Sequence, residues 1–358
     1  MKFALAGGGT GGHVYPAVAV AERLREIEGV TLVYYGTDRG PEHAVADHEG
    51  YEFRAIPAAQ VRVRSPWRLA RGLFRLWQGT RIAGEWLDRD RPSAVFATGG
   101  YAAAPVGRAA KQRKIPLIVF LPDAHPGWAV RFLARYATTV ACAVDAAVPR
   151  LPKGKTVVTG YPVRRQFLEA TRAEGIAKFG LDPNLPTVLV AGGSLGAHSI
   201  NLIVAGALRR WLDGAQVIHV CGRDEEHWLS KERDRLPEWQ QRRYHLHAYT
   251  EEMAYAMAAS DLAVTRAGAS TLGELPVMGL PAIVIPGAFS DQQVNADYLA
   301  RTGAAIHLPA DRIEEIETLV GDLLEDTPRR TAMAEAMRGL AHPEAAERLA
   351  QMVREVAA

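Results

Sequence analysis

A chain of 358 residues is longer than one hydrophobic core usually supports, so the length predicts two domains of ordinary size. Hydrophobic residues make up 48% and charged residues 23%, as in a soluble globular protein, and the net charge of +2 argues against nucleic-acid binding through bulk electrostatics. The two cysteines, Cys142 and Cys221, lie far apart, which suits a reducing cytoplasm and indicates no disulfide framework. The first apolar run is too short for a signal peptide, and no run approaches the roughly 18 apolar residues of a membrane span.

The N-terminus predicts a strand, a glycine loop and a helix. Residues 3–6 form a short apolar run, residues 7–13 read GGGTGGH, and apolar residues then recur at helical spacing. Glycine adopts positive φ readily and has no side chain to keep a ligand away, and a helix N-terminus presents unpaired N–H groups with partial positive charge. This stretch therefore indicates a site for an anion such as diphosphate, with His13 at its mouth.

The same glycines fit the G-x-G-x-x-G pattern of dinucleotide-binding loops. Such a site needs an acidic residue at the tip of the second strand to hold the ribose, but Gly36 and Thr37 occupy this place and Asp38 comes late. Nicotinamide or flavin binding is therefore disfavoured. A purely structural turn is equally compatible with this loop alone, but it is disfavoured once similar loops recur along the chain.

Strand patterns alternate with helical patterns through the first half, which predicts a parallel sheet with crossover helices. Strands are expected at residues 30–35, 94–97 and 117–120. The strand at 94–97 also ends in glycines, Gly99 and Gly100. Because ligand sites gather at the carboxyl ends of strands in such sheets, both glycine loops are expected to face one crevice.

Near residue 160 the pattern restarts and predicts a second Rossmann-like domain. A strand at 187–191 runs into a glycine loop at 192–197. Further strands are expected at residues 217–220, 244–248, 262–264 and 282–285. The C-terminal third is helical, with Pro343 before a last helix. Because no low-complexity linker separates the halves, they are expected to pack closely across a cleft.

The segment 265–275 places small residues and hydroxyls at a helix start just after a strand, which again indicates an anion site. Glu274 has two interpretations: Thr271-x-x-Glu274 fits a capping box, or the carboxylate accepts hydrogen bonds from a ribose diol. The helix alone favours the cap. The paired amides Gln292 and Gln293 after the next strand shift the balance toward the ribose, because amides bond sugar hydroxyls in both donor and acceptor senses.

Taken together, these motifs closely resemble the MurG family, cytoplasmic enzymes that transfer N-acetylglucosamine from its UDP donor to the muramoyl lipid intermediate of peptidoglycan synthesis. The resemblance covers nearly the whole chain. The motifs that carry it are residues 7–13, 99–101, 160–164, 192–194 and 266–274, and Gln292, Gln293 and Asn295. Several ordered motifs together are far more specific than any single glycine loop.

The resemblance implies a GT-B fold, an α/β architecture in which two Rossmann-like domains with parallel sheets face a central cleft. Residues 1–158 would form the N-terminal domain, which takes the acceptor and faces the membrane. Residues 159–342 would bind the UDP-sugar, and the C-terminal helix 343–358 would pack back on the first domain.

The resemblance also implies which residues bind the donor. The donor set comprises Arg164 and Ser194 for the diphosphate, Glu274 for the ribose, Gln292 and Gln293 for the sugar, the backbone near Tyr249 and Thr250 for the uracil, and the hydroxyl residues Ser270 and Thr271. No other cofactor and no metal ion is implied.

The acceptor, a polyprenyl-diphosphate-linked sugar, would place its diphosphate on the first two glycine loops. This acceptor set comprises Thr10, Gly11, Gly12, Gly99, Gly100, Tyr101 and Asp123. His13 is the candidate catalytic base that removes the proton of the attacking sugar hydroxyl, since a neutral imidazole suits that task, but a histidine beside a diphosphate could equally be a positioning group.

One segment departs from the family. Where the family usually shows His-Glu-Gln-Asn, residues 120–123 read Phe-Leu-Pro-Asp and continue Ala-His-Pro-Gly. The family's polar acceptor contacts therefore do not carry over. Asp123 and His125 could replace them, or they could be a loop cap and a solvated histidine.

Residues 62–86 interleave aromatic residues with arginines. Ser65-Pro66 predicts a helix start, and Leu69, Leu73 and Leu76 are expected to form one buried face. The residues left over, which suit a peripheral helix on an anionic membrane surface, are Trp67, Arg68, Arg71, Phe74, Arg75 and Trp77. The alternative is an ordinary crossover helix whose arginine stems cover apolar surface. A lipid-linked acceptor favours the membrane, at the cytoplasmic face.

Two patterns imitate metal sites. Asp88-Arg89-Asp90 has the D-x-D form but lies at an expected helix end before Pro92, where a solvated turn is the preferred interpretation. His245 and His247 share one strand face without a third ligand at fixed spacing.

The sequence therefore predicts an inverting, metal-independent glycosyltransferase that acts by single displacement. The alternatives are a related UDP-sugar transferase with another glycolipid or natural-product acceptor, a UDP-sugar epimerase on the same scaffold, and a nucleotide-sugar sensor without turnover.

Overall fold

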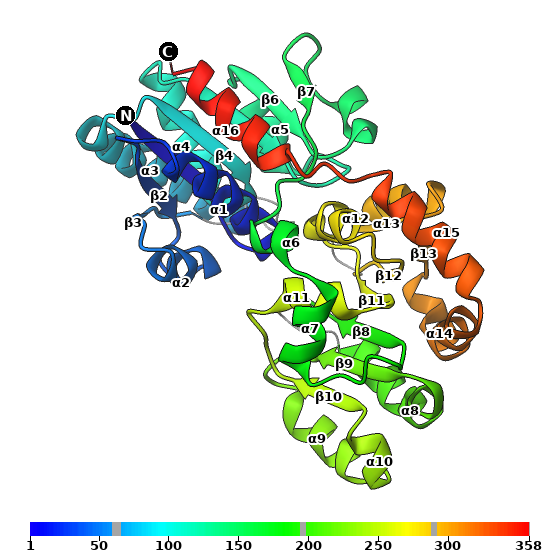
Figure 1. Cartoon of the computed structure of the whole chain (residues 1–358). Helices are drawn as coiled ribbons and strands as arrows, with labels where there is room; N and C mark the ends of the chain where they lie inside the picture. Colours follow the sequence, from blue (N-terminus) through cyan, green and yellow to red (C-terminus); the bar gives the residue numbers. More distant parts are fainter. Residues whose placement is uncertain (59–65, 194–197, 288–291, 358) are drawn as a thin grey trace. The chain divides into compact units, whose positions relative to one another are not determined.

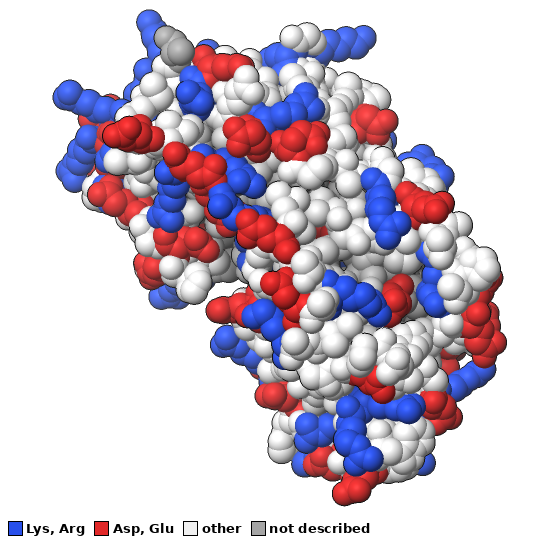
Figure 2. Space-filling model, in the orientation of Figure 1, with Lys and Arg blue, Asp and Glu red and all other residues white. Residues whose placement is uncertain are grey.

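The computed structural model describes residues 1–58, 66–193, 198–287 and 292–357, with residues 66–70 described by their backbone alone. The chain forms two compact units. Unit 1 comprises Met1–Arg165 together with His342–Ala358, and unit 2 comprises Gln166–Ala341. On the face drawn in Figure 2, basic and acidic side chains are interspersed.

Unit 1 is built on a seven-stranded parallel sheet in the order β3-β2-β1-β4-β5-β6-β7 (Figure 1). Its strands are β1 (Lys2–Gly7), β2 (Thr31–Gly36), β3 (Glu52–Ala55), β4 (Ala94–Gly99), β5 (Leu117–Leu121), β6 (Thr139–Cys142) and β7 (Thr156–Val158). Its helices are α1 (Gly11–Arg25), α2 (Pro41–His48), α3 (Pro66–Asp90), α4 (Gly100–Gln112), α5 (Trp128–Ala134), the 3-10 helix η1 (Asp145–Arg150) and α16 (Ala345–Glu355).

Unit 2 has a six-stranded parallel sheet in the order β10-β9-β8-β11-β12-β13. Its strands are β8 (Thr187–Ala191), β9 (Gln216–Val220), β10 (Tyr244–His247), β11 (Leu262–Arg266), β12 (Ala282–Ile285) and β13 (Ala305–His307). Its helices are α6 (Gln166–Glu169), α7 (Arg172–Phe179), α8 (His198–Gly214), α9 (Glu226–Asp234), α10 (Glu238–Gln241), α11 (Met253–Ala259), η2 (Ala269–Leu272), α12 (Glu274–Met278), α13 (Gln292–Arg301), η3 (Ala310–Glu315), α14 (Ile316–Glu325) and α15 (Thr327–Arg338).

Both sheets follow the doubly wound topology, in which the strand order reverses beside the first strand of the unit. In unit 1 this switch point lies between β1 and β4, and in unit 2 it lies between β8 and β11. The loops that leave these four strands are the glycine-rich segments of the sequence. The predicted α/β class with two parallel sheets is therefore confirmed.

The apolar runs in the sequence form the central strands because parallel sheets are covered by helices on both faces. β4, β5, β8 and β12 are buried along their whole length, as those runs predict. The predicted strands are confirmed, but β3, β6 and β13 were not foreseen. These three strands have three or four residues each, which is too short for a periodic pattern to stand out.

The C-terminal helix α16 packs against α1 and β4 within unit 1 (Figure 1). Its apolar stripe, which is buried, comprises Ala345, Ala346, Leu349, Ala350 and Val353. The chain passes twice through this region, where Gly160 at φ +85° lies so close to His342 that an added Cβ would come within 2.2 Å of the His342 Cβ. Only glycine fits there.

Candidate functional site

The first glycine loop connects β1 to α1 and is fixed by a buried carboxylate. Glu42 on α2 accepts hydrogen bonds from the backbone N–H of Gly9 at 3.0 Å, from the backbone N–H of Thr37 at 2.8 Å and from the Thr37 hydroxyl at 2.6 Å. Its side chain is fully buried. A carboxylate withdrawn from water is stable only when hydrogen bonds replace the lost hydration, and these three donors do so.

Glu42 was not foreseen from the sequence. A dinucleotide site needs an acidic residue at the tip of β2, and Asp38 comes too late in the sequence to supply it. The Glu42 carboxylate nevertheless lies at that tip, where it bonds Thr37. It faces inward and bonds the glycine loop, so it is not open to a ribose. The detectable signal was an acidic residue in the first turn of the helix that follows β2.

The N-terminus of α1 offers unpaired backbone N–H groups. Thr10 is the N-cap, with extended φ and ψ of −150° and 158°, and among the described residues its side chain caps no N–H of the helix. The first intrahelical bonds are donated to the Thr10 carbonyl by His13 at 3.0 Å and by Val14 at 3.2 Å. Gly11 and Gly12 precede them, so their N–H groups have no intrahelical acceptor, which is the arrangement that binds anions.

The second glycine loop lies directly against the first. Gly99 and Gly100 have φ of +94° and +72°, and α4 begins at Gly100. A Cβ at Gly100 would lie 2.0 Å from the Gly8 carbonyl oxygen, and a Cβ at Gly9 would lie 2.7 Å from the Tyr101 ring. The structure thus brings the predicted acceptor residues of both glycine loops together at the switch point of unit 1.

His13 is held in one orientation beside these loops. Its Nδ1 lies 2.9 Å from the Thr98 carbonyl oxygen on β4, and its own carbonyl accepts a hydrogen bond from the Thr98 hydroxyl. A carbonyl oxygen can only accept, so Nδ1 carries the ring hydrogen. In the neutral ring the lone pair is therefore on Nε2, which is the arrangement that a general base needs.

The segment that departs from the family begins in the core. Phe120 is fully buried on β5 and contacts Phe96 and the ring of Tyr161. Asp123, half-buried, follows at the carboxyl end of the strand. His125 is half-buried, and its Nε2 accepts a hydrogen bond from the Arg131 guanidinium at 3.0 Å.

Arg164 lies within unit 1, although the sequence placed it in the UDP-sugar domain. Its guanidinium stacks over the ring of Tyr15 on α1 at 4.3 Å, and unit 1 extends to Arg165. In unit 2, Gly192 and Gly193 follow β8, with Gly193 at φ +87°. Ser194 lies outside the described residues.

The capping box that was one interpretation of Thr271 and Glu274 is not formed. Thr271 donates its hydroxyl hydrogen bond to the Gly268 carbonyl, and α12 begins at Glu274 with Gly273 as its N-cap. The Glu274 side chain is buried beside η2, where Ser270 is half-buried. A capping box from Thr271 requires the helix to begin at residue 272, but α12 begins two residues later, so the capping interpretation is wrong.

Other side chains in this segment are tied to the backbone. Arg266 donates to the Pro286 carbonyl at 3.4 Å and to the Ser199 hydroxyl at 3.3 Å, and burial lowers the pKa of its guanidinium. Asn295, fully buried on α13, donates to the Ala267 carbonyl at 3.1 Å. This last bond couples α13 to the loop after β11.

The paired amides occupy the first turn of α13. Gln292 Oε1 accepts from the Gly287 N–H at 2.8 Å, and Gln293 is exposed with its Nε2 at 2.9 Å from His307 Nε2. Tyr249 follows β10, the strand at the other edge of the sheet, and is 46% exposed. The Thr250 hydroxyl accepts from the Glu252 N–H at 3.0 Å.

The two acids of the D-x-D pattern are paired with other residues. Asp88 pairs with Arg113 through two bonds of 2.7 Å, and Asp90 accepts from Arg54 at 2.9 and 3.1 Å and from the Tyr35 hydroxyl at 2.7 Å. Both acids lie at the end of α3, as expected; the Asp88 side chain is 61% exposed, but the Asp90 side chain is only 5% exposed, so the expected solvated position is wrong for Asp90. Across the described part of the chain, no three His, Cys, Asp or Glu side chains converge as metal ligands.

The two histidines of β10 are also accounted for by burial. Burial lowers the pKa of His245 to about 4, and it lowers the pKa of His247 as well. Both rings are therefore neutral at neutral pH. Their orientation on one strand face agrees with a half-buried edge strand.

The surface of α3 presents apolar side chains to solvent. Leu73, Phe74 and Trp77 are 50%, 60% and 55% exposed, and the Phe74 and Trp77 rings lie 5.9 Å apart between centroids. Arg71 and Arg75 are exposed beside them. Leu73 was expected in the buried face with Leu76, which is buried, so that prediction was wrong for Leu73. The side chains of Trp67 and Arg68 lie outside the described residues.

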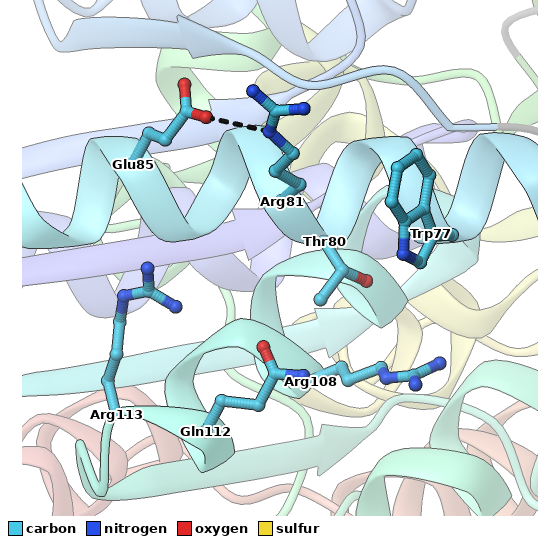
Figure 3. Close-up of a pocket in the computed structure, with 7 residues that line it drawn as sticks. All are labelled: Trp77, Thr80, Arg81, Glu85, Arg108, Gln112 and Arg113. Atoms are coloured by element: carbon cyan, nitrogen blue, oxygen red, sulfur yellow. Dashed lines mark hydrogen bonds and ion pairs between the residues drawn. The ribbon is translucent and has the colours of Figure 1, made fainter.

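A hollow of about 440 Å³ lies between α3 and α4 (Figure 3). It is lined by Trp77, Thr80, Arg81, Glu85, Arg108, Gln112 and Arg113, with Arg81 paired to Glu85 across one helical turn. Of the predicted site residues only Trp77 lines it, so it is distinct from the glycine-loop site. Throughout the described helices, none has both the length and the apolar character required to cross a membrane.

Comparison with known proteins agrees with this geometry. The glycosyltransferase family 28 N-terminal domain matches residues 3–142, and the family 28 C-terminal domain matches residues 187–349. A UDP-N-acetylglucosamine--N-acetylmuramyl-(pentapeptide) pyrophosphoryl-undecaprenol N-acetylglucosamine transferase from Roseiflexus sp. (strain RS-1) is 41% identical over 97% of this chain and 93% of its own length.

Solved structures extend the comparison to the fold. The crystal structure of Acinetobacter baumannii MurG is similar with a TM-score of 0.76 and 26% identity, and the match covers 99% of each chain. A UDP-GlcNAc 2-epimerase from Neisseria meningitidis, bound to UDP-GlcNAc, has a TM-score of 0.68 and 16% identity over 99% of this chain and 100% of its own, which shows a shared fold. The predicted GT-B architecture is confirmed, and the chain belongs to glycosyltransferase family 28 and, within it, to the MurG family.

Proposed function

We propose that this protein transfers N-acetylglucosamine from UDP-N-acetylglucosamine to an undecaprenyl-diphospho-muramoyl-pentapeptide, converting lipid I to lipid II in peptidoglycan synthesis. The relatives named above, matched over nearly their whole length, support this substrate pair. The structural observation that carries the proposal is the placement of His13, whose Nε2 lone pair is set by the Thr98 carbonyl beside the unpaired N–H groups of α1. A diphosphate-linked sugar that attacks the donor needs a base for its hydroxyl next to a site that binds its diphosphate.

On the acceptor side, the diphosphate would bind the N–H groups at the starts of α1 and α4, with Tyr101 and Asp123 nearby. The His13 Nε2 atom would accept the proton of the attacking sugar hydroxyl as that oxygen bonds to the anomeric carbon and UDP departs. Attack from the side opposite the leaving group inverts the configuration at the anomeric carbon. A base of this kind typically contributes a factor of about 10² to 10⁴ in rate.

On the donor side, Glu274 would accept from the ribose hydroxyls, Gln292 and Gln293 would bond the sugar, and the backbone near Tyr249 and Thr250 would hold the uracil. The remaining donor contacts would come from Ser270 and Thr271, whose η2 segment precedes α12. Negative charge on the departing UDP would be stabilised by Arg164, Ser194 and a helix N-terminus. These groups would do the work that a metal ion does in other transferases, so we propose a metal-independent reaction.

We further propose that the α3 surface binds an anionic membrane at the cytoplasmic face. α3 is a crossover helix that packs against α4, and Leu76, Ala83 and Leu87 are buried. Packing therefore accounts for one side of α3 and leaves Phe74 and Trp77 in solvent. Exposed aromatic residues beside arginines suit a membrane interface, where each arginine contributes about 1 kcal/mol on an anionic leaflet.

The membrane proposal is tested by sedimentation with anionic vesicles at low salt. A variant with Arg68, Arg71 and Arg75 each replaced by glutamate should bind the vesicles less and should lose activity on lipid-embedded acceptor, while activity on a soluble acceptor analogue persists. Absence of vesicle binding by the wild type, together with full activity of the variant on lipid substrate, would refute it.

A transferase with another glycolipid acceptor is the second candidate, and a specific observation favours it. Phe120 and Leu121 are buried where the family usually has a polar pair, so acceptor contacts at those positions are lost. An acceptor screen with labelled UDP-N-acetylglucosamine separates the candidates. Label in a lipid I-derived product supports our proposal, and label only in another glycolipid supports the alternative.

The same assay includes a reaction without acceptor. Isomerisation of the sugar in that reaction would indicate an epimerase, and inertness under every condition despite nucleotide-sugar binding would indicate a sensor. Either result would overturn the proposed transfer.

A further inference from the structure

A chain of three side chains lies at the carboxyl edge of the unit 2 sheet. Gln293 and Asp297 are four residues apart on α13 and therefore share one helix face. His307 is the last residue of β13, the strand against which α13 packs. Its Nε2 lies 2.9 Å from Gln293 Nε2, and its Nδ1 lies 2.8 Å from Asp297 Oδ1.

The protons of this chain can be assigned from the chemistry of its members. An ionised carboxylate only accepts, so His307 Nδ1 must carry the hydrogen that bonds Asp297. In the neutral ring, Nε2 then has the lone pair and must accept. The Gln293 group that meets it is therefore the NH₂, and the Gln293 carbonyl oxygen is turned away from the ring.

The groups around the His307 ring agree with this assignment of donors and acceptors. Asp297 is the charged group that the described residues bring into contact with the ring, and the neighbouring β12 contributes Val284 at the register position beside His307. The His307 side chain is only 14% exposed, whereas Asp297 is 47% exposed. A largely buried imidazole between two fixed partners has little freedom to reorient, so it can hold an exposed amide in one direction.

We propose that His307 and Asp297 are positioning residues that fix the direction of the Gln293 amide, so that its carbonyl oxygen accepts a hydroxyl hydrogen bond from the donor sugar. This inference rests on the proposed function through the role of Gln293 in sugar binding. Neither positioning residue touches the donor. If Gln293 bonds the hexose and not the nucleotide, loss of either positioning residue should weaken binding of the hexose and leave binding of the nucleotide unchanged.

The inference predicts a particular pattern of affinities. His307→Ala frees the Gln293 amide to rotate, which should weaken UDP-N-acetylglucosamine about five- to tenfold, the size of one neutral hydrogen bond. The affinity for UDP should stay within twofold of wild type. The effect should appear in KM, with kcat changed less. Asp297→Ala should act in the same direction, and His307→Gln should restore most of the affinity because its amide oxygen can accept at the Nε2 position.

A double-mutant cycle gives the decisive measurement. Titration calorimetry with UDP-N-acetylglucosamine and with UDP is carried out on wild type, Gln293→Ala, His307→Ala and the double variant. If His307 acts through Gln293, the double variant binds the nucleotide sugar no more weakly than Gln293→Ala. His48→Ala, at the exposed end of α2 in unit 1, is the matched control and should leave both affinities unchanged.

Three results would overturn the inference: independent, multiplicative losses in the cycle, an equal loss of UDP affinity in His307→Ala, or unchanged nucleotide-sugar affinity in Gln293→Ala. Each is distinguishable from failure of the proposed function. That failure appears as absence of transfer to the lipid acceptor by wild type, whereas the cycle depends only on equilibrium binding of the donor.

Discussion

At the switch point of unit 1 the candidate site is made largely of backbone groups, whereas the described candidate residues of unit 2 include a carboxylate and an amide side chain. Gly8, Gly99 and Gly100 bring two loops into contact in unit 1, and helix N-termini supply the donors. In unit 2, Glu274 and Gln293 lie at the carboxyl edge of the sheet. Backbone N–H groups recognise a charge without regard to what is attached to it, whereas carboxylates and amides distinguish patterns of hydroxyl groups.

The difference suggests how the two units divide recognition. Under the proposed function, the helix N-termini of unit 1 would place a diphosphate-linked acceptor by its charge, and His13 would meet the reacting hydroxyl. A nucleotide sugar has to be distinguished from other sugars, which requires several side chains held at fixed angles. Mutations should therefore affect turnover most in unit 1 and donor affinity most in unit 2.

The largest effect expected is that of His13→Ala. Removal of the base should lower kcat by about 10² to 10⁴-fold while the KM for UDP-N-acetylglucosamine stays nearly unchanged, because the ring serves the acceptor hydroxyl. The measurement is steady-state transfer to lipid I with both substrates varied. His13→Gln keeps a polar side chain of similar length without a comparable base and should be as slow. Retained turnover in either variant would remove His13 from the role of base.

The next effect tests whether the backbone contact in unit 1 is essential. Gly100→Ala should lower the free energy of unfolding by about 1–2 kcal/mol from the left-handed φ and by at least about 2 kcal/mol more from the collision with the Gly8 carbonyl. Gly29→Ala is the matched control, because Gly29 has φ +75° and no described atom lies within 4 Å of its added Cβ. Urea unfolding measures both. Equal losses would mean that the two loops do not constrain each other.

The fold and the candidate site could be predicted from the sequence where a feature depends on residues that are close together in the chain. The glycine loops and the central strands were predicted because their signals lie within ten residues. Glu42 was missed because its partners Gly9 and Thr37 come from two other loops, which only the folded sheet brings together. His307 was missed for the same reason, since its meaning depends on α13.

Two further differences have a similar origin. Arg164 was assigned to the wrong side of the boundary because a domain border is set by which core a segment packs against, and Tyr15 lies far from it in the sequence. Leu73 has the spacing of a buried residue, but half of its surface is exposed on α3. Helical periodicity identifies a stripe of residues without showing what covers it.

The buried histidine His219 should make the stability of unit 2 depend on pH. Burial lowers the pKa of His219 from 6.5 to about 3, and its neutral ring bonds the Tyr244 hydroxyl at 2.9 Å and Asn201 at 3.0 Å. Below pH 6.5 the unfolded chain binds this proton and the folded chain does not, so His219 alone should lower the free energy of unfolding by about 2 kcal/mol between pH 7.5 and pH 5. Urea unfolding of wild type and His219→Gln measures it. His245 shifts in the same direction, so the variant should keep a smaller dependence, and an unchanged slope would contradict the assignment.

The smallest effect distinguishes recognition of the ribose by Glu274 from a purely structural role of this buried side chain. Glu274→Gln replaces an acceptor of two ribose hydrogen bonds by an amide that accepts one, so the affinities for UDP and for UDP-N-acetylglucosamine should both fall about tenfold, or about 1.4 kcal/mol. The equal loss contrasts with the His307 variants, which should spare UDP, because the ribose belongs to both ligands and the hexose to only one. Glutamine has nearly the same size and can still accept a hydrogen bond, so a purely structural Glu274 would tolerate this substitution with donor affinity intact. Calorimetric titration with the two ligands decides the point, and it locates the boundary between nucleotide recognition at α12 and sugar recognition at α13.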